Sequence, residues 1–451
     1  MSFSPHTPED RKAMLEVLGL ETVDDLFSEI PPALRLHRRL DLPPAVTEEE
    51  LRREMKALAE KNAHGESYAI FMGGGIYDRY IPAAIPALLS RGEFLTAYTP
   101  YQPEASQGTL RWTYEFQTMI LELTGMEVAN ASMYDGASAA AEAALMALSL
   151  QKAPRNAILL PDTLHPQMRK AVATYVAGQG FGLRVLATRD GVLQPEELKE
   201  VLRREPSAYA AVFLGYPNYF GIVEDVKALI ETAHEYGVWA VVVADPVALA
   251  LLTPPGELGA DLVVGEGQGL GLPMAYGGPG FGFFTARMAH IRRMPGRIAG
   301  RTLDVNGREG FVLTLQTREQ HIRRARATSN ITTNHALMAL GATIYMTLLG
   351  PRGLREVAEA SLANAHLTLK LLEGAGARRT FAGPFFQEFV VELPGPLEKT
   401  WELALSRKVL PGIPLKKDYP ALQNHLLVAV TEKRTREEME ALAWAVKEAA
   451  S

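Results

Sequence analysis

The middle of the chain alternates short apolar runs with helical segments, and this pattern constrains the fold more than any other feature. Apolar runs of this kind are typical of strands that are buried on both faces of a parallel sheet. Strands are predicted at 156–160, 183–187, 210–214, 239–244, 260–264 and 280–284, and helices at 109–124, 138–150 and 225–236. The pattern therefore predicts an α/β fold with a mostly parallel sheet and flanking helices.

Periodicity and turn signals divide the 451 residues into three predicted regions. Residues 1–65 are predicted to form an N-terminal helical arm, because Thr7 and Thr47 each precede acidic residues in the manner of a helix cap. Residues 66–330 form the predicted large domain, which begins with ordered loops rich in Gly, Pro and Tyr. Residues 331–451 contain linking helices and a small α+β C-terminal domain. The elements predicted in this last part of the chain are helices at 329–349, 353–372, 397–410 and 435–450 and strands at 385–393 and 425–431.

Composition excludes several classes of protein. The net charge of -6 argues against a general binder of nucleic acid or of acidic membranes. No apolar run approaches the roughly 20 residues that span a bilayer, and the N-terminus lacks the apolar region of a signal peptide, so a cytoplasmic location is expected. The absence of cysteine excludes disulfides, thiolate catalysis and cysteine-based metal centres, and no metal site is predicted.

A glycine-rich stretch, GEGQGLGLPMAYGGPG at 265–280, follows the strand predicted at 260–264. Glycine allows the backbone to approach a ligand closely, and we expect this stretch to bind or pack and not to react. The chain has no lysine between Lys227 and Lys370, so the stretch offers no amine for a Schiff base. The spacing of its glycines does not fit G-x-G-x-x-G, which argues against a Rossmann dinucleotide site.

Polar or glycine-containing turns follow several predicted strands, where ligands bind in open α/β sheets. Gly136 and Ser138 lie at a helix N-terminus that either holds a phosphate or is only capped. His165 either stacks on a planar ring or titrates near neutrality, or it is a loop histidine that only makes a hydrogen bond. Asn218 either bonds a ring hydroxyl or forms an Asx turn. Asp245 either pairs with a protonated pyridine nitrogen or is an exposed loop acid or a helix cap. Taken in order, these turns resemble the layout of the fold-type I pyridoxal-phosphate (PLP) enzymes.

Longer motifs resemble the P-protein family of the glycine cleavage system, in the form that is divided between two chains. They cover most of residues 65–340 in the family's order. They include GGGIYDRYIPAAI, TAYTPYQPEASQG, FQTMILELTGMEVANASMYDGASAAAEA, YPNYFG, GEGQGLGLPMAYGGPG and the arginine-rich run 294–331. In the family's PLP-binding chain, a proline follows the Schiff-base lysine by five residues and a Gly-Pro-Gly segment comes next. Here Pro273 and GGPG follow Gln268 at that interval, so the resemblance places a carboxamide where the lysine is expected.

The resemblance implies a two-chain glycine decarboxylase in which P-protein subunit 2 supplies the lysine and binds PLP. Glycine loses carbon dioxide, and the aminomethyl group passes to lipoate on the H-protein. No catalytic residue is expected in this chain, and the subunits are expected to assemble as αβ or α2β2. A vestigial cofactor site is expected at Gly136, Ser138, His165, Asn218, Asp245 and Gln268. Two loops are expected to complete the partner's active site, through Gly73, Gly74, Gly75, Tyr77, Asp78, Tyr98, Thr99, Tyr101, Gln102, Glu104, Ser106 and Gln107.

Ten arginines and only three acidic residues lie between Arg287 and Arg326. This segment either binds the acidic, lipoylated H-protein, a carboxylate or a phosphate, or its arginines form ion pairs within the chain. Two other hypotheses for the whole chain are a self-sufficient PLP enzyme that uses Lys227 and a structural scaffold that contacts no ligand. Lys227 falls inside a predicted helix, and the tyrosines and hydroxyls of the two loops argue against a scaffold.

Overall fold

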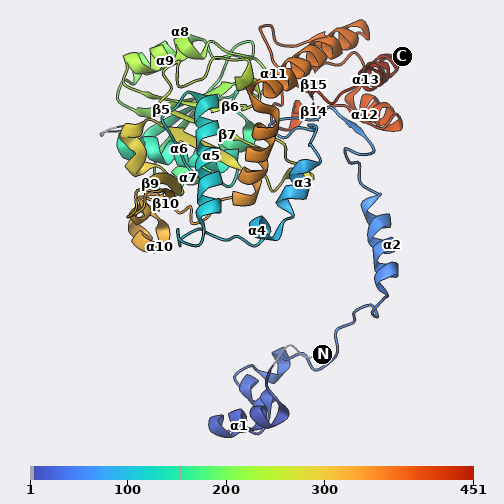
Figure 1. Cartoon of the computed structure of the whole chain (residues 1–451). Helices are drawn as coiled ribbons and strands as arrows, with labels where there is room; N and C mark the ends of the chain where they lie inside the picture. Colours follow the sequence, from blue (N-terminus) through green and yellow to red (C-terminus); the bar gives the residue numbers. More distant parts are fainter. Residues whose placement is uncertain (1–4, 152–154) are drawn as a thin grey trace. The chain divides into compact units, whose positions relative to one another are not determined.

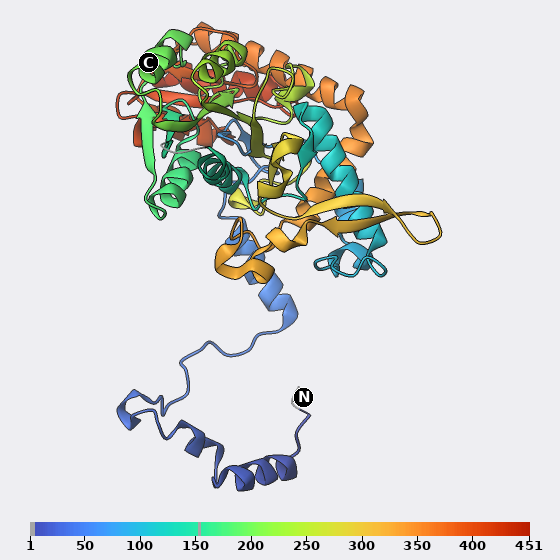
Figure 2. The ribbon, with the colours of Figure 1, turned by 90° about the vertical axis from the view of Figure 1, so that its left-hand side faces the viewer.

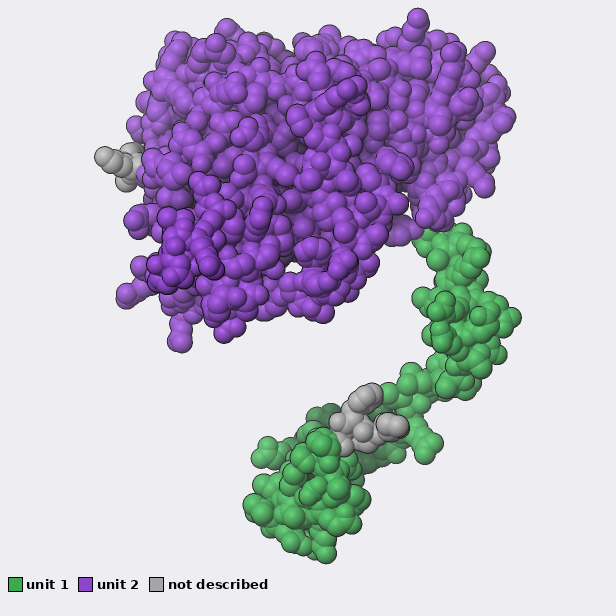
Figure 3. All heavy atoms as spheres, in the orientation of Figure 1, with its two compact units in different colours: residues 1–63 green, residues 64–451 purple. Residues whose placement is uncertain are grey.

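The computed structural model describes residues 5–151 and 155–451, and the chain divides into two compact units, residues 1–63 and 64–451 (Figure 3). The smaller unit contains helices α1 (Pro8–Leu18) and α2 (Glu48–Ala59). The side chains of Thr7 and Thr47 accept hydrogen bonds from the backbone N–H groups of Asp10 and Glu50, so both predicted caps are confirmed. Neither helix has a buried residue within the described chain.

The larger unit is built on a seven-stranded sheet with the strand order β2-β8-β7-β6-β5-β3-β4 (Figure 1). The strands are β2 (Val128–Ala129), β3 (Ala157–Pro161), β4 (Gly182–Leu186), β5 (Tyr209–Tyr216), β6 (Trp239–Ala244), β7 (Leu262–Glu266) and β8 (Gly282–Ala286). Strands β3 to β7 pair in parallel, whereas β8 runs antiparallel to both β7 and β2. The predicted α/β fold with a mostly parallel sheet is confirmed.

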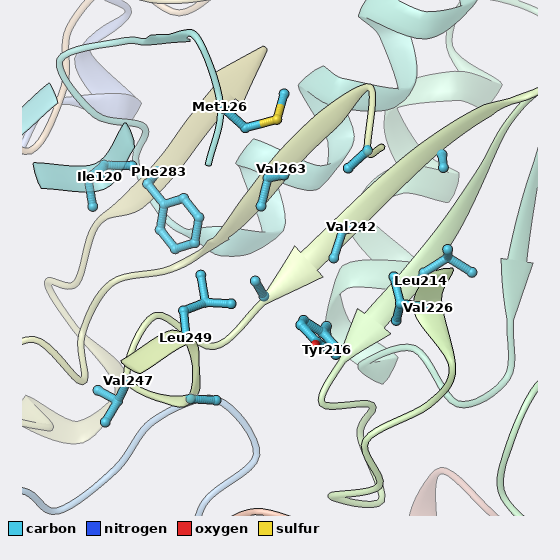
Figure 4. Packing of buried hydrophobic residues seen from close by; sticks show 14 of the residues in the cluster. Ile120, Met126, Leu214, Tyr216, Val226, Val242, Val247, Leu249, Val263 and Phe283 are labelled. Carbon is cyan, nitrogen blue, oxygen red and sulfur yellow. The ribbon is translucent and has the colours of Figure 1, made fainter. Parts of the chain in front are cut away.

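Both faces of this sheet are covered, because side chains alternate between two apolar clusters. In β6, Val242 belongs to one cluster, while Val241 and Val243 belong to the other. Figure 4 shows Val242 beside Val263 and Leu214 in the first cluster. The covering helices are α5 (Gln107–Thr124), α8 (Pro195–Arg204) and α9 (Val226–Glu235) on that face, and α6 (Gly136–Leu150) and α7 (Pro166–Ala177) on the other. Helices α7 and α8 are absent from the sequence-based prediction, although each begins with proline, a helix-start signal.

A long helix, α11 (Ala336–Gly374), follows the sheet and bends at Gly350, whose φ is +60°. The prediction of two helices with a break at this glycine is confirmed, but the predicted start at residue 329 is wrong. Asn334 donates to the carbonyl of Ala131, and His335 contacts the carbonyl of Gly280. These tertiary hydrogen bonds hold residues 329–335 outside the helix, and local periodicity does not reveal them.

The C-terminal part contains a four-stranded antiparallel sheet in the order β11-β12-β15-β14. Its strands are β11 (Arg378–Arg379), β12 (Glu388–Glu392), β14 (Ile413–Pro414) and β15 (His425–Ala429), and its helices are α12 (Leu397–Ser406) and α13 (Arg436–Ala450). A short parallel pair, β1 (Ala69–Ile70) and β13 (Val409–Leu410), joins the first loops of the unit to this part. Glu388 at the start of β12 therefore lies close to the loop that follows β1.

Strands β9 (Ile298–Leu303) and β10 (Glu309–Thr314) form an antiparallel hairpin (Figure 2). The sequence-based prediction includes these residues only as part of the arginine-rich segment. The turn of the hairpin is Asp304-Val305-Asn306-Gly307, in which Gly307 has a φ of +76°. The Asn-Gly pair is a hairpin signal that the sequence offered. Phe311 and Leu313 of β10 pack with Leu110 of α5. None of the helices among the described residues has both the length and the apolar character needed to cross a membrane.

Candidate functional site

The carboxyl ends of β3, β5, β6 and β7 surround a cavity of about 80 Å³. Its lining includes three of the residues predicted for a vestigial site, His165, Asn218 and Asp245, together with Glu266 and Glu388. A cavity of this size is far below the roughly 300–1,000 Å³ of small-molecule sites. We call this arrangement the closed site, because the chain's own side chains fill it.

Gln268 precedes Gly269, which lines the closed site, and is only 1% exposed. Its side-chain oxygen accepts from the backbone N–H of Tyr77 at 2.8 Å, and its amide nitrogen donates to the Tyr77 carbonyl at 3.0 Å. The same nitrogen donates to the carbonyl of Leu272 at 2.7 Å. Gln268 thus pairs with both backbone groups of one residue in the 73–78 loop and holds that loop over the sheet edge.

Glu266, which was not singled out from the sequence, occupies the N-terminus of α6. One carboxylate oxygen accepts from the N–H of Gly136 at 2.8 Å, and the other accepts from the N–H of Gln268 at 3.1 Å. Gly136 permits this approach, because a Cβ at that position would lie 2.8 Å from the backbone nitrogen of Glu266. A helix N-terminus attracts anions, and here an internal carboxylate lies at the turn for which phosphate binding was one of two alternatives. Burial raises the pKa of Glu266 to about 7.

The second predicted residue of that turn, Ser138, takes part in capping. Its backbone N–H donates to the carboxylate of Asp135 at 2.6 Å, and its hydroxyl accepts from the N–H of Asp135 at 3.1 Å. This reciprocal pair is a capping box, the alternative that the sequence had left open. The first donors of α6 are therefore already occupied by Asp135 and Glu266.

The Asx-turn alternative is confirmed for Asn218. Its oxygen accepts from the N–H groups of Phe220 and Ile222, and its nitrogen donates to the carbonyl of Gly191 and to Glu224. All four hydrogen-bonding positions of this amide are used within the chain. Asn218 shapes the wall of the closed site and has no free donor for a ligand.

His165 is held in the neutral form at the opposite wall. Its Nδ1 accepts from the N–H of Gln167, so its Nε2 donates to the carbonyl of Gly74 at 2.7 Å. Burial lowers the pKa of His165. The ring packs edge-on against Tyr219, with 4.9 Å between ring centroids. The chain thus supplies both the aromatic contact and the hydrogen-bond partner of this histidine.

Asp245 has its carboxylate directed to protein groups on both sides. One oxygen accepts from the N–H of Val247 at 2.8 Å, and the other accepts from the side-chain amide of Gln387 at 2.7 Å. Gln387 in turn accepts from Arg79, which also pairs with Glu432 at 2.7 Å. Burial raises the pKa of Asp245. Asp245 thus bonds the turn that follows β6, where the short 3-10 helix Ala248–Ala250 has Val247 as its N-cap residue. The network links the sheet edge to the C-terminal part.

The 73–78 loop is bound to its own chain throughout. Glu388 accepts from the N–H of Gly74 at 2.7 Å and from the hydroxyl of Tyr77 at 2.9 Å. Gly73 lies against the same carboxylate, and Gly75 lines the closed site. The carboxylate of Asp78 forms ion pairs with the partly exposed Lys433 and with the buried Arg434, each at 2.8 Å. The polar side chains of Tyr77 and Asp78 are thus engaged within the chain.

Glu388 provides a pH-dependent contribution to stability. Burial raises its pKa from 4.5 to about 7, so the folded protein binds its proton more tightly than the unfolded chain does. The resulting stabilisation is complete below pH 4.5 and is lost as the pH rises through 7, with a total of up to about 3 kcal/mol.

We therefore expect Glu388→Gln to gain stability relative to the wild type between pH 5 and pH 8. Urea unfolding at several pH values measures this gain, which should approach a few kcal/mol. The exposed Glu359→Gln serves as the control. A constant difference between Glu388→Gln and the wild type across this range would contradict the assignment.

A second cavity, of about 350 Å³, lies at the 97–100 loop and is separate from the closed site in its lining. Its walls come from that loop, from α5, from Arg297 just before β9, from β10, and from the start of α11 with the residues before it. The lining includes Tyr98, Thr99, Thr109, Thr113, Arg297, Thr333, Asn334 and His335. Its volume falls within the range of small-molecule sites, and hydroxyl groups, an arginine and a histidine line it.

The 98–107 loop presents several of its predicted residues to solvent. Tyr98 is 82% exposed, and Gln102 and Glu104 are also exposed. The hydroxyl of Tyr101 accepts from Arg297 at 2.9 Å, and Arg297 also stacks over the tyrosine ring. Ser106 immediately precedes α5, and Gln107 exchanges hydrogen bonds with the backbone of Phe311 in β10. The loop is thus anchored at Tyr101 and at Gln107, while the side chain of Tyr98 is exposed to solvent.

Known proteins are similar to this chain at two levels, the fold class and the protein family. The fold is that of the fold-type I PLP-dependent enzymes. Similar structures at low identity show this fold, such as a sphingosine-1-phosphate lyase from Burkholderia pseudomallei (18% identity, TM-score 0.65, covering 93% of this chain and 94% of that one). The profile of the glycine cleavage system P-protein family matches residues 1–446, and the chain belongs to this family.

Relatives that align over nearly their full length share one name. Proteins from Geobacillus sp. (47% identical over 438 residues) and Desulforamulus reducens (48% over 444 residues) are each called a probable glycine dehydrogenase (decarboxylating) subunit 1. The alignments cover 97% of this chain and of the Geobacillus protein, and 98% of this chain and of the Desulforamulus protein. A crystal structure of a glycine decarboxylase P-protein in inhibitor-bound form superposes with a TM-score of 0.87 at 43% identity, covering 100% of both chains.

Proposed function

We propose that this chain is the subunit of a two-chain glycine decarboxylase that holds no PLP of its own. The observation that carries the proposal is the closed site. Gln268 cannot form a Schiff base, and Glu266 already occupies the anion-binding end of α6. The remaining space is about 80 Å³. These residues do not fit the cofactor, and we assign both PLP and its lysine to P-protein subunit 2.

We further propose that the second cavity serves the active site of the partner. Its volume of about 350 Å³ is in the range of small-molecule sites, and its lining combines hydroxyl groups with apolar side chains such as Leu313 and Met338. The ligands proposed for the assembled enzyme are glycine and the lipoyl arm of the H-protein. Tyr98 and Tyr101 would orient these ligands and exclude water, and Arg297 holds Tyr101 in position. The assembly is proposed to be αβ or α2β2 and cytoplasmic.

The structure supports neither of the two alternative functions, a self-sufficient PLP enzyme that uses Lys227 or a structural scaffold that contacts no ligand. Lys227 lies in α9, its side chain is 65% exposed, and it approaches Glu231 at 4.0 Å. It does not line the closed site. Tyr98 is exposed and lines the second cavity, which is expected for an active site shared with a partner and is not required of a scaffold that contacts no ligand.

The proposal is tested by purifying this chain alone, subunit 2 alone and the two together. We expect that the isolated chain shows no aldimine absorbance with PLP, and that the complex contains PLP and exchanges glycine carboxyl with bicarbonate in the presence of H-protein. Size measurement distinguishes αβ from α2β2. Covalent PLP on the isolated chain, or equal activity of subunit 2 without this chain, would contradict the proposal.

A further inference from the structure

The arginine-rich segment divides into paired and unpaired side chains. Arg287, Arg297 and Arg301 pair with Glu127, Glu319 and Glu309 at 3.6, 3.4 and 3.4 Å. Arg318 donates to the backbone carbonyls of Met294 and Gly296. Within the described residues, no acidic group lies in ion-pair range of the other six, Arg292, Arg293, Arg308, Arg323, Arg324 and Arg326. The alternative of internal ion pairs therefore holds for only three of the ten arginines.

Five of the unpaired arginines are carried by neighbouring segments. Two end a short 3-10 helix, η5 (Met288–Arg293), and three lie in or just after α10 (Gln320–Arg323). The bonds from Arg318 to Met294 and Gly296 hold the second segment against the chain that follows η5. We call these exposed residues the arginine patch: Arg292, Arg293, Arg323, Arg324 and Arg326.

The arginine patch adjoins the loop that lines the second cavity. His321 of α10 packs edge-on against Tyr101, with 5.4 Å between ring centroids. Tyr101 in turn bonds Arg297, which lines the cavity. A molecule bound at the arginine patch would therefore lie beside the 97–101 loop.

The charge of the patch differs in sign from that of the chain as a whole. The chain has a net charge of -6, so five uncompensated positive charges on two adjacent turns create a local field of opposite sign. Such a field steers an acidic partner and accelerates its association. The centre of a permanent subunit interface is more apolar, whereas the large apolar side chains among residues 288–293 and 318–326 are only Met288, Ile291 and Ile322. The patch thus suits transient docking of a protein that presents carboxylates.

We infer that the arginine patch is the docking surface for an acidic carrier protein that delivers its prosthetic arm to the second cavity. This inference rests on the proposed function, in which that carrier is the lipoylated H-protein. The patch supplies attraction and orientation, and the cavity receives the arm.

The test compares double variants that remove the same charge from two different surfaces. Arg323→Gln/Arg326→Gln and, separately, Arg292→Gln/Arg293→Gln neutralise the patch. Arg352→Gln/Arg355→Gln is the matched control on α11, where the two exposed arginines pair with Glu356 and Glu359. Binding of lipoylated H-protein to the two-chain complex is measured by calorimetry and stopped flow at several salt concentrations.

We expect each patch variant to raise the Kd of the H-protein roughly two- to tenfold, mainly through slower association, and to weaken its salt dependence. The control should stay within about twofold of the wild type. Patch variants that match the control, or wild-type binding that is insensitive to salt, would overturn the inference. Loss of assembly with subunit 2 in both patch variants would assign the patch to the subunit interface and also overturn it. Failure of the wild-type complex to decarboxylate glycine would contradict the proposed function instead, because binding is measured independently.

Discussion

Replacing Gln268 with alanine is expected to lower the free energy of unfolding by about 3–5 kcal/mol. The change removes three hydrogen bonds inside the protein and leaves the N–H and carbonyl of Tyr77 and the carbonyl of Leu272 without partners. Each unpaired buried polar group costs roughly 1–3 kcal/mol, and the loss of side-chain volume adds to this cost. Urea unfolding of the isolated chain measures the effect.

Gln268→Ala should also make the 73–78 loop more mobile. Hydrogen exchange at Tyr77 and its neighbours is expected to accelerate, because Gln268 bonds directly to the backbone of that residue. Gln423→Ala provides a control, since the amide of Gln423 makes one exposed hydrogen bond to Pro420. A loss of stability no greater than in the control would show that Gln268 does not hold the closed site together.

Alanine at Tyr98 or at Tyr101 is expected to reduce turnover of the two-chain enzyme about 10- to 100-fold. Tyr98 is 82% exposed beside the second cavity, so its removal should change the stability of the isolated chain by less than about 0.5 kcal/mol. A large loss of activity without a loss of stability indicates a role in positioning ligands. Steady-state kinetics of the reconstituted complex with H-protein supply the measurement.

Two variants make this experiment specific. Tyr80→Ala removes another exposed tyrosine that lines neither cavity and should leave turnover unchanged. Tyr98→Phe keeps the aromatic ring and removes only the hydroxyl, so its turnover distinguishes the contribution of the hydroxyl from that of the ring. Turnover of Tyr98→Ala equal to that of Tyr80→Ala would remove Tyr98 from the proposed active site.

The two cavities suggest a division of tasks within the chain. At the closed site, three acids with elevated pKa values, Asp245, Glu266 and Glu388, each accept hydrogen bonds from neighbouring groups of the same chain. These bonds connect the sheet edge to the loop after β1 and to the C-terminal sheet. We propose that the closed site gives the chain its rigidity, while the second cavity supplies the groups that act on ligands.

Part of the site was predictable from the order of residues along the chain. His165, Asn218 and Asp245 follow β3, β5 and β6, and parallel strands bring their carboxyl ends to one edge. Glu266 was not singled out, although an acid at the end of an apolar strand is an unusual signal. Glu388 belongs to a strand more than 100 residues further along the chain, and no local pattern relates it to the loop after β1.

The sequence by itself determined the α/β fold, the helix caps and the absence of an amine at position 268, because these depend on periodicity, neighbouring residues and the identity of one side chain. Only the tertiary structure decided that Glu266 covers the end of α6, that Gln268 binds Tyr77 and that six arginines lack an acidic partner within the described chain. These properties depend on which distant segments meet and how deeply they are buried. Contacts such as Glu266 with Gly136, 130 positions apart, and Gln268 with Tyr77, 191 positions apart, arise only once the chain is folded.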